Sequence, residues 1–111
     1  MSKIKIIGGG LAGTECALYL ANHGIEVELY EMKPKKCSPA HKSENFAELV
    51  CSNSLKSNDV YGNAAGLLKE EMRVLGSSVI AVADKTKDPA GNALAVNREE
   101  FSFLLTKMVK E

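Results

Sequence analysis

The stretch that decides the fold reads Lys-Ile-Lys-Ile-Ile-Gly-Gly-Gly-Leu-Ala-Gly-Thr-Glu and covers residues 3–15. Residues 3–7 are rich in β-branched side chains, which predicts a strand that runs directly into a glycine turn. Residues 11–23 then carry apolar side chains at three- and four-residue spacing, which predicts a helix that ends at Gly24. Residues 25–30 alternate as a strand does. Together these segments predict a βαβ unit.

The glycines of the turn follow the pattern G-x-G-x-x-G. In this pattern Gly8 permits a sharp turn, Gly10 leaves room for a pyrophosphate, and Gly13 lets the helix pack closely on the strand. Glu31 closes the second strand eighteen residues after Gly13, where a carboxylate can accept hydrogen bonds from an adenosine ribose. The set indicates dinucleotide binding rather than a merely structural turn. The acid disfavours NADP but does not separate NAD from FAD.

The rest of the chain predicts further helices and only weak strand signals. Asn97 stands three residues before Glu100, an arrangement that caps a helix. The expected elements are a short helix at 43–50, a loop at 53–62, a helix at 63–75 with Ala64, Leu67, Leu68, Met72 and Leu75 on one face, a strand at 79–83, a turn at 84–92, a strand at 93–96, and a final helix from 98. Because only two strands are expected to run parallel, the predicted class is α/β, a Rossmann-like βαβ unit with an incomplete parallel sheet. Residues 1–111 then form the N-terminal portion of a larger domain.

Composition narrows the class of protein. The chain has 111 residues, and 14 Lys and Arg balance 14 Asp and Glu. This balance excludes a strongly basic nucleic-acid arm, and 45% apolar residues exclude a long disordered tail. No apolar run approaches the ~20 residues of a membrane span, and the first residues enter a strand pattern without a signal peptide. Three cysteines, an odd number, do not suggest a disulfide framework, so we expect a cytoplasmic protein.

The cysteines differ in their surroundings. Cys16 falls on the apolar stripe of the first helix, which predicts a core position. Cys51 stands beside small polar residues and Lys56, an environment that can lower the pKa of a thiol, although composition alone favours a buried structural cysteine. The spacing of Cys37, His41 and Cys51 matches no closed zinc pattern, so no metal site is predicted.

Two groups of charged residues have ordinary interpretations. Glu15 lies near the start of the first predicted helix, where its charge stabilises the helix dipole. Four lysines among residues 33–42 could contact RNA phosphates, but a solvated loop is the favoured interpretation at zero net charge.

Several motifs beyond the glycine turn bear on function, and they identify a family. The segments are Ile-Gly-Gly-Gly-Leu-Ala-Gly-Thr-Glu (7–15), Leu-Tyr-Glu-Met-Lys-Pro (29–34), Pro-Ala-His (39–41), Phe-Ala-Glu-Leu-Val-Cys-Ser-Asn-Ser-Leu-Lys-Ser (46–57), Asn-Ala-Ala-Gly-Leu-Leu-Lys-Glu-Glu-Met-Arg (63–73), Pro-Ala-Gly (89–91) and Ala-Leu-Ala-Val-Asn-Arg-Glu-Glu-Phe (93–101). The chain resembles the N-terminal part of the folate- and FAD-dependent tRNA uracil-5-methyltransferases. Residues 46–57 carry the specific part of the resemblance, whereas many flavoproteins share the glycine turn. Asn97 departs from the Asp expected in the family.

The resemblance implies a bacterial cytoplasmic enzyme that methylates carbon five of a T-loop uridine in tRNA. Methylenetetrahydrofolate supplies the carbon, and FAD reduced by NAD(P)H supplies the electrons; neither DNA nor a membrane is implied as a partner. By resemblance, the FAD pyrophosphate is held by Gly8, Gly9, Gly10, Leu11, Ala12 and Gly13, and the ribose by Glu31. Cys51 matches one of two cysteines that act on the uracil ring, either as nucleophile at carbon six or as the base at carbon five.

Two alternatives remain open at this point. One is a related flavoprotein of tRNA wobble-uridine modification, which shares the glycine turn, and the other is a non-catalytic nucleotide-binding remnant. The second family cysteine falls beyond residue 111, so we expect the chain alone to be inactive and to bind FAD weakly.

Overall fold

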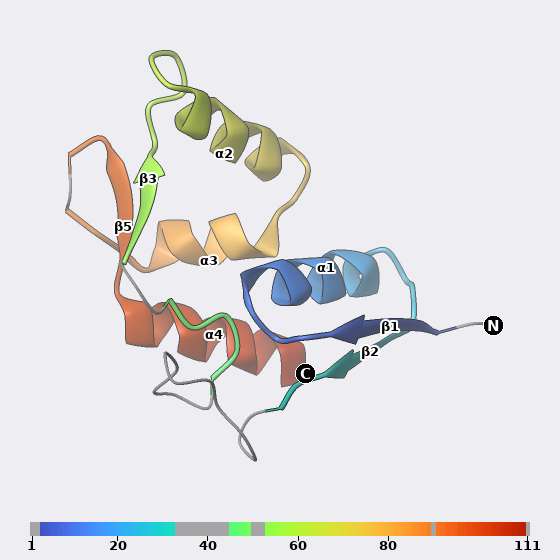
Figure 1. Cartoon of the computed structure of the whole chain (residues 1–111). Helices are drawn as coiled ribbons and strands as arrows, with labels where there is room; N and C mark the ends of the chain where they lie inside the picture. The colour runs from blue at the N-terminus through green and yellow to red at the C-terminus, as the bar shows by residue number, and fades with distance from the viewer. Residues whose placement is uncertain (1–2, 33–44, 50–52, 90, 111) are drawn as a thin grey trace.

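The computed structural model describes residues 3–32, 45–49, 53–89 and 91–110. Figure 1 shows a parallel strand pair with its helix on one side of the molecule and an antiparallel sheet with further helices on the other. In chain order the elements are β1 (Ile4–Ile7), α1 (Leu11–Asn22), β2 (Val27–Tyr30), β3 (Ser54–Ser57), α2 (Ala64–Val74), α3 (Ser78–Lys85), β4 (Lys87–Asp88), β5 (Ala93–Val96) and α4 (Arg98–Lys110).

The predicted βαβ unit is confirmed. β1 and β2 pair in parallel, from Ile4 opposite Val27 to Ile7 opposite Tyr30. α1 connects them and packs against both strands, and the chain leaves the helix through Gly24 at a φ of 76°. Two parallel strands must be joined by a crossover connection, and here the glycine turn and α1 form that connection.

A second, antiparallel sheet follows the strand order β3-β5-β4. The predicted strand at 93–96 is confirmed as β5, but the prediction of a loop throughout 53–62 is wrong, because residues 54–57 form β3. Ser54 pairs with Ala95 and Ser57 with Ala93, and the register shifts between them, where Lys56 has a φ of 70°. A short polar strand of this kind is specified by its partner rather than by its own pattern.

The predicted strand at 79–83 is wrong, because these residues lie in α3. Ser77 caps the helix, and its Oγ accepts a hydrogen bond from Ile80 N at 3.1 Å. Val79, Val82 and Ala83 then lie on one buried helical face. A short apolar run fits either a strand or a buried helix, and here the cap and the three- and four-residue spacing decide.

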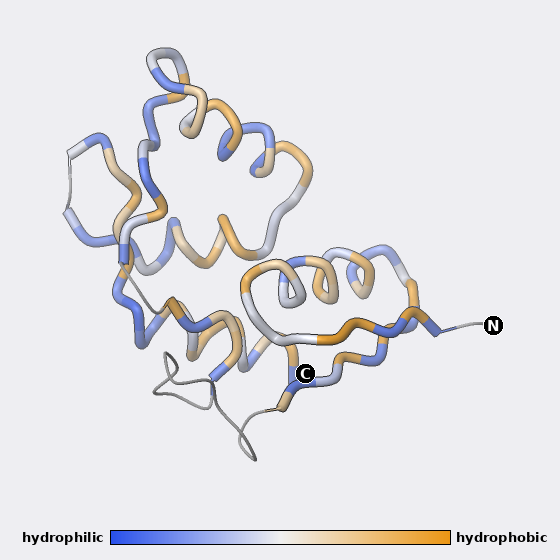
Figure 2. The backbone as a smooth tube through the Cα atoms, in the orientation of Figure 1, coloured by the Kyte–Doolittle hydropathy of each residue, from blue (hydrophilic) through white to orange (hydrophobic). Residues whose placement is uncertain are grey.

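The core lies where α1, α3, β5 and α4 meet, and Figure 2 shows the apolar stretches of these elements in orange. Phe101 and Leu105 of α4 are fully buried, and Asn97 Oδ1 accepts from Glu100 N at 3.1 Å to cap the helix. The short helix predicted at 43–50 is wrong for residues 45–49, where residues 45–47 form bends and residues 48–49 have no regular structure. The core residues are Leu18, Ala47, Leu49, Val79, Val82, Ala83, Leu94, Val96, Phe101 and Leu105.

Two predicted apolar faces do not point into this core. α1 buries Thr14, Ala17 and Leu18, and Cys16 is exposed, so its predicted core position is wrong. α1 is apolar on most of its circumference, so spacing alone did not fix the buried side. The helix predicted at 63–75 is confirmed as α2, yet it buries Gly66 and Lys69. Leu67 and Leu68 of this helix, and Leu75 at its C-cap, remain about half or more exposed.

The parallel sheet stays narrow among the described residues. It contains β1 and β2 alone, and the Ile7 side chain at its end is 89% exposed. None of the helices in residues 3–32, 45–49, 53–89 and 91–110 combines the length and apolarity that a membrane span needs.

Candidate functional site

The glycine turn at the end of β1 is the candidate site, and two of its glycines are required by geometry. Gly8 N donates to Tyr30 O at 2.7 Å, and Gly8 has a φ of 105°, which L side chains rarely adopt. A Cβ placed on Gly13 would lie 1.8 Å from Gly8 O. The close approach of α1 to the turn therefore depends on glycine at position 13.

The amino end of α1 is open. Gly10 occupies the N-cap position in an extended conformation, and no side chain makes a capping hydrogen bond there. A Cβ placed on Gly10 would meet no atom within 4 Å. Leu11 and Ala12, the first residues of the helix, are exposed. The first N–H groups of a helix have no partners within it and carry a partial positive charge, so this end can bind an anion.

Glu31 lies beside the turn, as the predicted site requires. It follows β2, its Oε1 accepts from Met32 N at 2.8 Å, and its Oε2 lies 3.0 Å from a Cβ placed on Gly9. The Phe46 ring flanks the same point, with Cδ1 at 2.8 Å from that Cβ. The structure therefore brings Glu31 to the glycine turn from a position eighteen residues after Gly13. It also adds Phe46, which the sequence pattern did not predict.

The Gly9 carbonyl accepts hydrogen bonds from two residues that the sequence pattern did not predict. Thr14 Oγ1 donates to Gly9 O at 3.2 Å, and Ala47 N donates to the same oxygen at 2.8 Å. Both residues are fully buried. The only available signal was a threonine inside an apolar helix; nothing in the sequence placed residue 47 next to residue 9.

Cys51, the predicted catalytic residue, lies outside the described residues, as do Cys37 and His41. The described residues on either side of Cys51, Leu49 and Asn53, are held by hydrogen bonds. Arg98 Nη1 donates to Leu49 O at 3.3 Å, and Asn53 Nδ2 donates to Val96 O at 3.2 Å. Within the described part of the chain, no three His, Cys, Asp or Glu side chains gather as a metal site.

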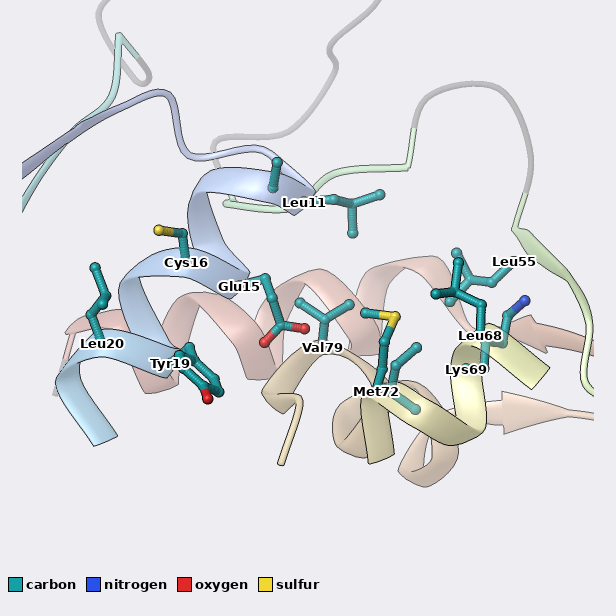
Figure 3. Close-up of a pocket in the computed structure, with 12 residues that line it drawn as sticks. Leu11, Glu15, Cys16, Tyr19, Leu20, Leu55, Leu68, Lys69, Met72 and Val79 are labelled. Atoms are coloured by element: carbon teal, nitrogen blue, oxygen red, sulfur yellow. The ribbon is translucent and has the colours of Figure 1, made fainter. Parts of the chain in front are cut away.

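A separate apolar cavity of about 620 Å³ lies among α1, α2 and α3. Among the side chains that line it, Figure 3 shows Glu15 and Cys16 on α1 and Lys69 on α2. Both charged groups are already engaged. The Glu15 carboxylate accepts from Ser77 Oγ and, at 3.1 Å, from Ser78 N, so it caps α3 instead of serving its own helix as predicted. Lys69 Nζ donates to Ser57 O at 2.9 Å, and burial, then the charges of neighbouring cations, lower its pKa.

One titratable pair lies on β2, near the site. Tyr30 Oη donates to Glu28 Oε2 at 2.6 Å. This bond raises the pKa of Tyr30, because the carboxylate stabilises the protonated phenol. The same bond, followed by the contact with Lys3, lowers the pKa of Glu28.

Known proteins have sequences similar to that of this chain. The profile of one protein family, described as glucose inhibited division protein A (GIDA), matches residues 3–111, which is nearly the whole chain. The chain belongs to this GIDA family. Membership agrees with the βαβ unit and the glycine turn described above, and it confirms the predicted fold class.

Relatives with high identity carry a more specific name. The chain is 58% identical to a Lactobacillus gasseri protein over all 111 residues and 60% identical to one from Desulfitobacterium hafniense over the same length, in each case 25% of the relative. A Bacillus subtilis protein is 58% identical over 107 residues, which cover 96% of the chain and 24% of the relative. All three are named methylenetetrahydrofolate–tRNA-(uracil-5-)-methyltransferase TrmFO. The predicted resemblance is confirmed, and the chain spans about a quarter of the length of these relatives.

Proposed function

We propose that this chain supplies the FAD-binding turn of a folate-dependent tRNA methyltransferase that acts on carbon five of a T-loop uridine. The observation that carries the proposal is the exposed, uncapped amino end of α1, with Gly10 open in front of it and Glu31 beside it. The names of relatives at 58–60% identity support the reaction class. Family membership alone does not identify the reaction, because the family is described as glucose inhibited division protein A and not as a methyltransferase.

The residues present fit a flavin dinucleotide. The backbone N–H groups of Gly10, Leu11 and Ala12 would hold the pyrophosphate, since an anion at this helix end needs no basic side chain. Glu31 would accept hydrogen bonds from the ribose, and its charge opposes a 2′-phosphate. Bound FAD would supply the reducing equivalents for the methyl group, with NAD(P)H as their source and methylenetetrahydrofolate as the carbon donor.

Cys51 is the proposed catalytic residue on the uracil ring. A thiolate can add to carbon six, which makes carbon five nucleophilic, or it can remove the proton from carbon five. The sequence around it offers hydroxyl and amide donors and Lys56, which favour the thiolate. The hydrogen bonds from Arg98 to Leu49 O and from Asn53 to Val96 O hold the chain on both sides of residues 50–52.

The test uses a polypeptide in which this chain is followed by the remaining length of the Desulfitobacterium hafniense relative. Unmodified tRNA, methylenetetrahydrofolate, FAD and NADH are supplied, and the product nucleosides are identified by mass spectrometry. We expect 5-methyluridine in the T-loop, its loss with Cys51→Ala, and its retention with the control Cys16→Ala. A modified wobble uridine would support the alternative flavoprotein, and a polypeptide that binds no FAD would contradict the proposal.

The chain of 111 residues by itself is expected to have no methyltransferase activity and weak affinity for FAD. Purification of this chain with tightly bound, stoichiometric flavin would contradict that expectation.

A further inference from the structure

We infer that α4 positions the glycine turn through a hydrogen-bonded strap, in which Thr106 and Ser102 hold Phe46 and Ala47 and Ala47 holds Gly9. These are positioning residues, because they act on the turn through one another. The inference rests on the proposed function for its effect on FAD, and on the described contacts for the strap itself.

The strap starts from two hydroxyl groups on α4. Thr106 Oγ1 accepts from Phe46 N at 2.8 Å and donates to Ser102 O at 2.7 Å. Ser102 Oγ donates to Ala47 O at 3.1 Å. Both hydroxyl side chains are buried, so water does not offer ready replacements for these bonds. Two consecutive residues, Phe46 and Ala47, are thereby fixed to a helix more than fifty positions away.

The strap ends on the turn. Ala47 N donates to Gly9 O at 2.8 Å, and Thr14 Oγ1 donates to the same oxygen from within α1. The Gly9 carbonyl therefore points at two fully buried donors. Ala47 has a φ of 55°, a left-handed conformation that alanine adopts only when its surroundings hold it. Here the bonds to its N–H and its C=O supply that restraint.

The direction of this carbonyl sets the direction of the next amide. In a planar trans peptide the C=O of one residue and the N–H of the next point in opposite directions. Because Gly9 O points inward to Ala47 and Thr14, the N–H of Gly10 points away from them. Gly10 is exposed, with open space beyond its Cα. The strap therefore fixes, before any ligand arrives, an amide that we propose for the pyrophosphate.

The test compares two threonines that make the same local bond. Thr106 Oγ1 and Thr86 Oγ1 each donate to the carbonyl four residues earlier, at 2.7 and 2.9 Å, and both side chains are buried. Only Thr106 also accepts from Phe46 N. In the full-length polypeptide described above, FAD affinity is measured by quenching of flavin fluorescence. We expect Thr106→Val to weaken FAD binding about fivefold or more, Thr86→Val to leave it within about twofold, and Thr106→Ser to restore it.

A second readout needs no flavin. Hydrogen exchange of the Phe46 and Ala47 amides should accelerate in Thr106→Val and stay unchanged in Thr86→Val. If Thr106→Val binds FAD as the unaltered polypeptide does, or if these two amides keep their protection, the strap inference is wrong and the proposed function stands. If the unaltered polypeptide binds no FAD, the proposed function is wrong, and the exchange rates alone decide whether the strap exists.

Discussion

Alanine at two glycines of the turn should give opposite results, although both substitutions add the same methyl group. At Gly13 the added Cβ would lie 1.8 Å from Gly8 O and 3.0 Å from Gly8 C, both of them backbone atoms. At Gly10 the added Cβ would meet no atom within 4 Å, and the φ of −78° suits alanine. Gly13→Ala should therefore lower the stability of the protein, whereas Gly10→Ala should lower FAD binding and leave the stability nearly unchanged.

The loss in the free energy of unfolding expected for Gly13→Ala follows from the steric clash that has to be relieved. Ordinary Cβ contacts begin near 3.4 Å, so α1 would have to move by more than 1 Å from the turn. α1 also packs against α3, α4 and β2, and such a movement opens those contacts. Overpacking typically costs about 1–3 kcal/mol, and because the clash is with backbone we expect Gly13→Ala to lie near 3 kcal/mol. Gly10→Ala should change the free energy of unfolding by less than about 1 kcal/mol.

Urea denaturation followed by far-UV circular dichroism measures the stability difference, and flavin fluorescence measures FAD affinity in the full-length polypeptide. We expect Gly10→Ala to keep its unfolding midpoint and to lose FAD affinity, because the methyl group occupies the space in front of the α1 amides. The reasoning is refuted if Gly13→Ala unfolds at the unaltered midpoint, or if Gly10→Ala is the more destabilised variant.

Three further measurements test other parts of the structure. Glu15→Ala removes the acceptor at the start of α3 and leaves Ser77 without that bond, so urea midpoints should show a loss of about 1–2 kcal/mol. Phe101→Ala empties a fully buried position and should cost about 3–5 kcal/mol by the same assay. With the other tyrosines replaced by phenylalanine, absorbance titration should show a lower pKa for Tyr30 in Glu28→Gln than in the unaltered protein. Because folding raises the pKa of Tyr30, the bond to Glu28 contributes stability below pH 10, and this contribution is lost as the pH rises through the folded-state pKa.

The βαβ unit and its turn were predictable because their information is local. Glycines at fixed spacing, a strand pattern before them and Glu31 after the second strand all follow from neighbouring residues. The structure places Glu31 against the turn, as that pattern requires. Cys51 stays a prediction, since it lies outside the described residues.

The elements that escaped prediction depend in part on partners far away in the sequence. Residues 79–83 look like a strand until Ser77 and the distant Glu15 are seen to cap them as a helix. β3 is a strand because β5 pairs with it. The buried side of α1 includes Thr14, a polar residue that apolar spacing does not select, and its buried hydroxyl donates a hydrogen bond to Gly9 O.

The narrow parallel sheet has a practical consequence for work with this chain. A strand with an unpaired edge and an exposed isoleucine at its end is a template for pairing with another molecule. β1, with Ile7 89% exposed and only β2 beside it in the described residues, has this character. Concentrated solutions of the 111-residue chain should therefore scatter light increasingly with time, and lysine at position 7 should slow that growth.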